Sequence, residues 1–136
     1  MKPREFTLPS GTRILLGRNS ENNDELVKKF EGKENIILHT AKPGSPFCVI
    51  ENAKESKKLT KEELYLSGSI CASKSQDWRD NKGNVIVHQF TGKDIYKDKT
   101  MKSGSWGIKK RPKRIKIKKG DIEKLENAGN KTNTAW

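Results

Sequence analysis

The basic segment from Val85 to Lys119 constrains this chain more than any other stretch. Twelve of its residues are Lys or Arg and only two are acidic, so it carries nearly all of the net charge of +12. Val85, Val87 and Gln89 alternate with Ile86, His88 and Phe90, and Ile115 and Ile117 alternate with Arg114, Lys116 and Lys118. A period of two is typical of strands with one buried face, so we expect the cations on these strands to share a face.

Patterned charge of this density predicts a polyanionic partner, and nucleic acid in particular. The loop from Lys102 to Gly107 holds Gly104, two serines and Trp106. Its backbone can approach a phosphate closely, and its aromatic ring can stack on a base. A lysine-rich surface that only keeps the protein in solution is the simpler alternative, but the strand pattern favours a nucleic-acid surface.

The 136 residues fit one domain, and a hydrophobic content of 31% allows a modest core. No run of about 18 apolar residues is present for a membrane span, and the N-terminus leads into an alternating strand instead of a signal peptide. We therefore expect a cytoplasmic protein. Cys48 and Cys71 stand in apolar settings, which predicts reduced, buried thiols.

Two β-hairpins are expected in the first half of the chain. Residues 4–8 and 12–16 flank a Pro-Ser-Gly turn, and residues 35–40 and 46–51 flank a second turn at 41–45. His39 ends the third of these strands. It can either hydrogen-bond the turn or donate to a phosphate, and we favour the hydrogen bond.

The polar cluster at 17–24 precedes a short helix expected over 25–30. Asn22 and Asp24 are expected to cap that helix. Arg18 and Asn19 lie before its start, where the free amides and the dipole of a helix terminus suit an anionic ligand.

A second helix is expected from Thr60 to Ser73, with Thr60 and Glu63 forming a capping box and Trp78 near its end as a core residue. Residues 52–58 are expected to form a mobile loop. Asp121 should cap a short helix over 121–126, and residues 127–136 should fray. These elements predict a single α+β domain, a mostly antiparallel sheet of hairpins with two main helices and a short C-terminal helix.

Motifs of catalysis and metal binding are missing from the sequence. It has no phosphate-loop motif, no Gly-x-Ser-x-Gly elbow and no paired histidines of a metalloprotease. His39, Cys48, Cys71 and His88 lack the spacing of a zinc site, and nothing marks a base near Cys71. We therefore expect a binding module, not an enzyme, with no metal and no cofactor.

The order of the motifs resembles the NFACT-R domain, the RNA-binding module of the NFACT proteins of ribosome-associated quality control, bacterial RqcH and eukaryotic NEMF. The resemblance spans roughly residues 5–119. It is carried by the hairpin strand Thr12 to Leu16, Gly17-Arg18-Asn19, Asn23-Asp24 with Leu26, Leu38-His39-Thr40, Pro43-Gly44-Ser45, and the basic strands with Lys93, Lys97 and Gly104.

Some positions depart from the family pattern. Ile37 stands where the family often has Trp, Pro46 stands where it has a polar residue or histidine, and the spacing from His39 to Pro43 is one residue shorter. The family's N-terminal domain, helix-hairpin-helix and coiled coil are missing. The chain thus resembles a stand-alone NFACT-R protein, with the domain over residues 1–120 and a short helix and flexible tail over 121–136. Elongation of nascent chains is not expected of this chain alone.

The resemblance implies binding of structured RNA, tRNA or ribosomal RNA, with the large ribosomal subunit as a candidate partner and DNA as a possible competitor. An accessory subunit of an RNA-modification enzyme, or such an enzyme, and a protein-interaction module on the ribosome are the alternatives. We expect phosphate contacts or shaping roles for twelve residues: Arg18, Asn19, His39, Lys42, Ser45, Lys93, Lys97, Lys99, Lys102, Trp106, Lys109 and Lys110.

Overall fold

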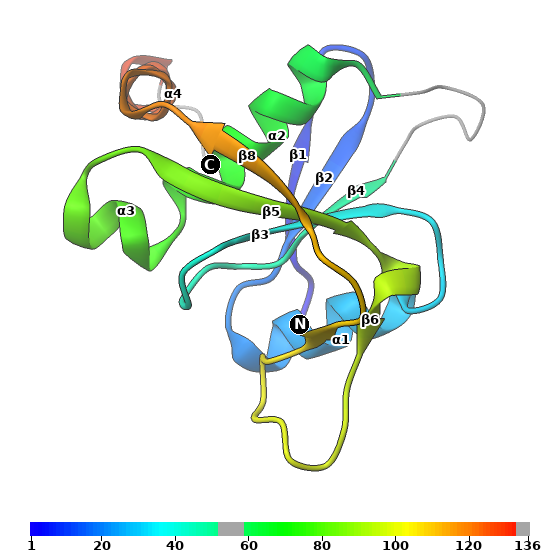
Figure 1. Ribbon diagram of the computed structural model, residues 1–136. Helices are drawn as coiled ribbons and strands as arrows, with labels where there is room; N and C mark the ends of the chain where they lie inside the picture. The colour runs from blue at the N-terminus through cyan, green and yellow to red at the C-terminus, as the bar shows by residue number, and fades with distance from the viewer. Residues whose placement is uncertain (52–58, 133–136) are drawn as a thin grey trace.

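A six-stranded antiparallel sheet forms the centre of the protein, in a computed structural model that describes residues 1–51 and 59–132 (Figure 1). The loop expected over 52–58 and the tail residues 133–136 lie outside the described residues. The chain order is β1 (Arg4–Thr7), β2 (Arg13–Leu16), α1 (Ser20–Phe30), β3 (Ile36–Thr40), β4 (Cys48–Glu51), α2 (Lys61–Ser73), α3 (Gln76–Asn81), β5 (Val85–Thr91), the 3-10 turn η1 (Gly92–Asp94), β6 (Ile95–Tyr96), β7 (Gly107–Ile108), β8 (Lys113–Ile117) and α4 (Lys119–Thr132). The expected α+β class is confirmed.

Both expected hairpins are present, but the sheet does not follow chain order. Its strands run β1-β2-β4-β3-β5-β8, so β4 lies between β2 and β3. Cys48, Val49 and Ile50 of β4 are all buried, as a central strand requires. Strands β6 and β7 pair separately as a small second sheet, which sequence analysis missed because each is only two residues long.

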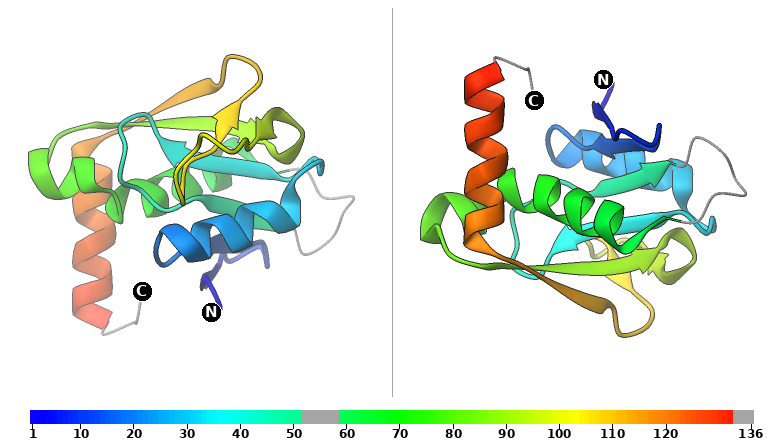
Figure 2. Two further views of the ribbon diagram at one scale, coloured as in Figure 1. Left: turned by 90° about the horizontal axis from the view of Figure 1, so that it is seen from below. Right: turned by 90° about the horizontal axis from the view of Figure 1, so that it is seen from above.

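Helices cover both faces of the large sheet (Figure 2). On one face, α2 packs against β3, β5 and β8, and α4 packs against α2. On the other face, Leu26, Val27 and Phe30 of α1 join Ile37 and Phe90 in a second buried cluster. This second face is the one on which the groove described below opens, and we call it the groove face.

The register of β5 and β8 confirms the alternation expected in the basic segment. Val87 lies opposite Ile115, and this pair faces α2. His88 lies opposite Arg114, and Ile86 lies opposite Lys116, so Arg114 and Lys116 are neighbours on the groove face. Arg114 and Lys116 are exposed. Lys113 is also exposed, but it has the parity of Ile115 and therefore lies on the opposite face.

The start of α1 differs from the expectation. The helix begins at Ser20, five residues earlier than predicted, and Asn19 is its N-cap, with its side chain accepting from the Asn22 amide at 2.8 Å. Asn22 and Asp24 therefore do not cap the helix. Sequence reasoning placed them before it because polar residues favour turns, whereas here they lie inside the helix and bond to other segments.

The second half of the chain contains more helix than expected. The predicted capping box of Thr60 and Glu63 is present at the start of α2, but Trp78 lies in a separate helix, α3, where its side chain is buried. Helix α4 begins at Lys119 and extends to Thr132, so it is longer than predicted. Asp121 is not its cap, because it lies inside the first turn of the helix, where its carboxylate accepts from the Tyr65 hydroxyl at 2.5 Å. Within the residues described, no helix is both long and apolar enough to cross a membrane.

Candidate nucleic-acid interface

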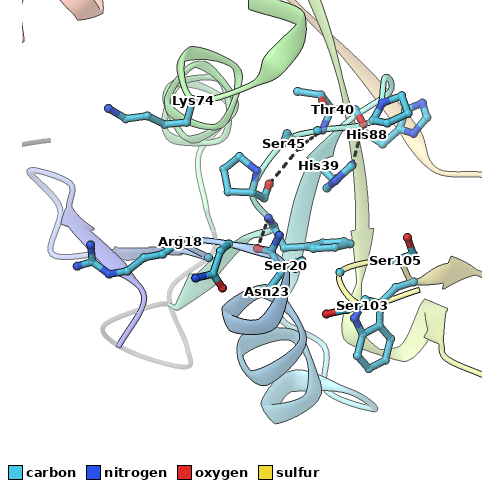
Figure 3. Close-up of a pocket in the computed structure, with 18 of the residues that line it drawn as sticks. Arg18, Ser20, Asn23, His39, Thr40, Ser45, Lys74, His88, Ser103 and Ser105 are labelled. Atoms are coloured by element: carbon cyan, nitrogen blue, oxygen red, sulfur yellow. Dashed lines mark hydrogen bonds between the residues drawn. The ribbon is translucent and has the colours of Figure 1, made fainter. Parts of the chain in front are cut away.

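A groove of about 620 Å³ opens between the N-terminal end of α1, the turn joining β3 to β4 and the loop joining β6 to β7 (Figure 3). Its lining residues are Arg4, Gly17 to Ser20, Asn23, His39 to Ala41, Pro43 to Phe47, Lys74, Arg79, His88, Phe90, Ile95, Ser103 to Trp106 and Ile108. Segments from the whole length of the domain therefore meet here.

Gly17 and Asn23 fix the wall formed by the β3–β4 turn. The Asn23 side-chain oxygen accepts from the Phe47 amide at 3.0 Å, and the Gly17 amide donates to the Phe47 carbonyl at 3.1 Å. A Cβ atom on Gly17 would lie 1.8 Å from the Asn23 oxygen. Glycine is required at this position because any side chain would displace the asparagine that holds the turn.

The turn itself is closed by Ser45. The Thr40 amide donates to the Ser45 hydroxyl at 3.1 Å, and that hydroxyl donates to the Pro46 carbonyl at 3.2 Å. Gly44 takes a φ of +91°, which a residue with a side chain rarely adopts. Ser45 thus shapes the groove through its backbone contacts.

Asp24 holds the opposite wall, the loop from Lys97 to Trp106. Its carboxylate accepts from the Lys97 ammonium at 3.0 Å, the Gly104 amide at 3.0 Å and the Trp106 indole at 2.9 Å, and also from the Ser103 hydroxyl at 3.2 Å. Burial raises the pKa of Asp24, but the hydrogen bonds from Lys97, Gly104 and Trp106 outweigh it, so the pKa lies below its ordinary value.

This network bears on the role expected for the loop. The sequence predicts a loop whose backbone can approach a phosphate, and in the structure its Gly104 amide and Ser103 hydroxyl donate to the protein's own carboxylate. The Lys97 ammonium also donates to the carbonyls of Lys102 and Ser105 at 2.9 and 3.0 Å. Lys97 therefore positions the loop, and its charge is compensated internally.

His39 and His88 lie directly opposite each other on β3 and β5 and both line the groove. The Nδ1 atom of His39 lies 2.8 Å from the carbonyl of Thr40, the last residue of β3, so it carries a proton and donates. Burial lowers the pKa of His39, and burial followed by the charge of Arg114 lowers the pKa of His88. Both rings are therefore neutral at pH 7.

Among the residues that the structure describes, four cations line the groove: Arg4, Arg18, Lys74 and Arg79. Arg79 donates to the carbonyl of Lys74 at 3.2 Å, and Arg18 donates through Nε to the carbonyl of Lys2 at 2.7 Å. A guanidinium has five N–H donors, so each arginine keeps others for a ligand. Figure 3 shows Lys74 and Arg18 across the groove from His39 and His88.

The structure brings five of the twelve predicted residues together in the groove: Arg18, Asn19, His39, Ser45 and Trp106. The other seven lie outside the groove lining. Lys42, Lys93 and Lys110 form ion pairs with Asp77, Glu34 and Asp94, at 3.6, 2.8 and 3.4 Å, and Lys97 pairs with Asp24. Lys99, Lys102 and Lys109 are exposed.

Sequence reasoning missed Arg4, Lys74, Arg79 and His88 as groove residues. The first three belong to segments with no basic cluster, so no local signal marks them. His88 follows the strand alternation, and its pairing with His39 depends on β3 lying beside β5. That neighbour relation joins residues 49 positions apart and cannot be read from periodicity.

The two cysteines are free and fully buried, as expected. Burial raises the pKa of the Cys71 thiol to about 12 and the pKa of Cys48 well above its ordinary value. A thiol with such a pKa is protonated at pH 7 and is a poor nucleophile. Among the described residues, no group of three or more His, Cys, Asp or Glu side chains is arranged to hold a metal ion.

These elements make up a small α+β domain, in which an antiparallel sheet has helices on both faces and a groove edged by cations and aromatic rings. Residues 2–110 match the family model described as the NFACT protein RNA binding domain, and the chain belongs to this family of RNA-binding domains. The family match confirms the resemblance to the NFACT-R domain that the motifs indicate.

Two proteins of known name or structure are similar to this chain over most of its length. The archaeal Rqc2 homolog aRqcH of Methanocaldococcus jannaschii is 26% identical over 102 residues, which cover 75% of this chain and 15% of that protein. The C-terminal part of the fibronectin/fibrinogen-binding protein from Streptococcus suis has a similar fold, with a TM-score of 0.74 and 22% identity over 91% of this chain and 49% of that one. The chain therefore spans only a part of either relative.

Proposed function

We propose that this chain binds structured RNA, tRNA or ribosomal RNA, across a continuous surface made of the groove and the groove face of β5 and β8. We further propose that it acts in the cytoplasm as a binding module without catalytic chemistry of its own. Membership of an RNA-binding family and the excess of positive charge support this proposal.

One observation carries the proposal: the strand register puts exposed cations beside the groove. Arg114 lies opposite His88, which lines the groove. Lys116 follows two residues later in β8 and therefore points to the same face of the sheet. With the four cations of the groove, they form a basic surface to which both halves of the chain contribute. Phosphates supply most of the non-specific affinity of nucleic acid for such a surface.

The archaeal relative is named as an Rqc2 homolog, and we extend that role to this chain as a proposal. The chain would contribute RNA binding to ribosome-associated quality control, with the large ribosomal subunit as its site of action. Association with purified large subunits that is lost after substitution of Lys116 would support this role, and association unaffected by that change would argue against it.

A matched pair of substitutions tests the surface. Lys113 and Lys116 are both exposed on β8 but lie on opposite faces. Lys116→Gln should weaken binding of tRNA by about fivefold at about 0.1 M salt, the contribution of one phosphate contact. Lys113→Gln makes the same change in charge and should have little effect. Equal losses in a fluorescence-anisotropy titration would contradict the proposed surface.

A further inference from the structure

We infer that the groove accepts one unpaired nucleotide of the bound RNA, with its phosphate at the cationic end and its base at the aromatic end. This inference rests on the proposed RNA-binding function and specifies what the groove itself takes. It follows from the two unlike ends of the groove, from its size and from the basic strand beside it.

The cationic end gathers like charges from separate segments. Arg79 donates to the backbone of Lys74, and Arg4 lies close enough to affect the same lysine. Burial, and then the charge of Arg4, lower the pKa of Lys74, while Glu126 opposes them. Arg18 lies on this side as well (Figure 3). An anion bound here would relieve the mutual repulsion of these cations, and a phosphate suits the planar donors of the arginines.

The opposite end consists of uncharged rings. The His39 ring lies 4.5 Å from the Phe47 ring, and Phe47 meets Phe90 edge-on at 6.4 Å between ring centres. His88 lies beside His39, and Trp106 completes this part of the lining. Because the imidazoles are neutral, they offer flat polarizable surfaces and not charge. Such an end favours a heterocyclic base over a second phosphate.

The size of the groove limits the ligand to a single nucleotide or a comparably small group. Its volume of about 620 Å³ falls within the range of small-molecule pockets, about 300 to 1,000 Å³. A base within a duplex is paired and stacked, so only a base that is unpaired or turned out of the helix could enter. Arg114 and Lys116, on the groove face next to His88, can hold other phosphates of the same RNA, which favours a nucleotide within an RNA chain over a free one.

Two RNA hairpins that differ by one base provide the test. The first carries a single bulged adenosine, and the second carries an abasic ribose at the same position, so both have the same number of phosphates. The wild-type protein should bind the first at least about fivefold more tightly, since stacking of one base on an aromatic side chain supplies that much or more. Equal affinities for the two hairpins would overturn the inference.

Substitutions separate the groove from the basic strand. Trp106→Ala and His88→Ala should each reduce the preference for the bulged base. Trp106→Phe removes the indole bond to Asp24 but keeps a ring, so it should retain most of the preference. Lys116→Gln should weaken both hairpins equally and leave their ratio unchanged. Circular dichroism and a thermal melt of each variant show that it is folded before its affinity is compared.

The failure of this inference is distinguishable from failure of the proposed function. Equal binding of both hairpins with sensitivity to Lys116→Gln would leave RNA binding intact and reject the nucleotide site. Absence of binding to either hairpin would reject both. A competition experiment with adenosine monophosphate tests whether the nucleotide belongs to an RNA chain. Displacement of the bulged hairpin only at millimolar concentration would support a nucleotide held within a chain. Tighter binding of the free nucleotide than of the hairpin would overturn that assignment.

Discussion

At the scale of single residues, Asp24 shows how a motif suited to binding an anion can be satisfied from within the protein. Glycine and serine in a loop expose N–H and O–H donors, and sequence alone does not show which anion they meet. Here they meet a carboxylate from α1. The loop forms one wall of the groove, and its Gly104 amide and Ser103 hydroxyl already have a partner within the protein.

Asp24→Asn should destabilise the protein by about 1 to 3 kcal/mol, because hydrogen bonds to a charged acceptor contribute about that much and the new amide would face several donors. The change also removes the partner of Lys97. Urea unfolding followed by tryptophan fluorescence measures the loss. Glu21→Gln removes the same charge from an exposed position on the same helix and should shift the midpoint little.

The two histidines should make the protein less stable on mild acidification. Their pKa values are lowered in the folded state, so the unfolded chain binds protons first as the pH falls below about 6.5. The stabilising contribution of the two neutral histidines should therefore be complete above about pH 6.5. As the pH falls from there to the folded-state pKa values, the free energy of unfolding should decrease. Urea titrations at about pH 5 and 7.5 measure the effect, and His39→Gln combined with His88→Gln should flatten it. A double variant that keeps the wild-type slope would contradict this origin.

At the scale of elements, local signals predicted what local interactions determine. The capping box of α2 and the Pro-Ser-Gly turn of the first hairpin involve residues within a few positions of each other, and both are present. The start of α1 and the length of α4 depend on distant partners. Asn23 bonds to Phe47, and Asp121 bonds to Tyr65, so the helical state of these polar segments is stabilised by contacts that periodicity does not reveal.

Two glycines in different elements should respond oppositely to alanine. Gly17→Ala would overlap the Asn23 side chain and should cost about 1 to 3 kcal/mol while distorting the groove. Gly120 lies in α4 with no other atom near the place of a new Cβ. Gly120→Ala should stabilise the protein by about 0.5 to 1 kcal/mol, because alanine is the better helix former. The melting temperatures of the two variants should shift in opposite directions from that of the wild-type protein. Shifts in the same direction would contradict the roles assigned to these two glycines.

At the scale of the whole molecule, the sequence predicted the family, but it did not predict which cations the fold gathers around the groove. The basic segment correctly indicated a strand in which apolar residues alternate with polar ones; Arg114 and Lys116 share one face of β8, and Lys113 lies on the other. It did not show that Lys93 and Lys110 would meet Glu34 and Asp94, or that Arg4 and Lys74 would join Arg18 around the groove. Ion pairs and pockets both form between segments, so charge counted along the chain differs from charge available to a partner.

This difference determines how salt should affect RNA binding. If the surface neutralises about five phosphates, log affinity should fall with log salt at a slope of about −3.5 to −4.5. Replacing Arg114 and Lys116 with glutamine should make the slope shallower by about 1.4 to 1.8, because two phosphate contacts are lost. Replacing Lys93 and Lys110 with glutamine removes the same charge from residues that already have carboxylate partners, so that slope should change little.

Binding titrations between about 50 and 300 mM salt compare the three proteins. A wild-type slope near zero would exclude the electrostatic surface, and equal changes in the two double variants would show that net charge, and not its placement on the groove face, determines the affinity.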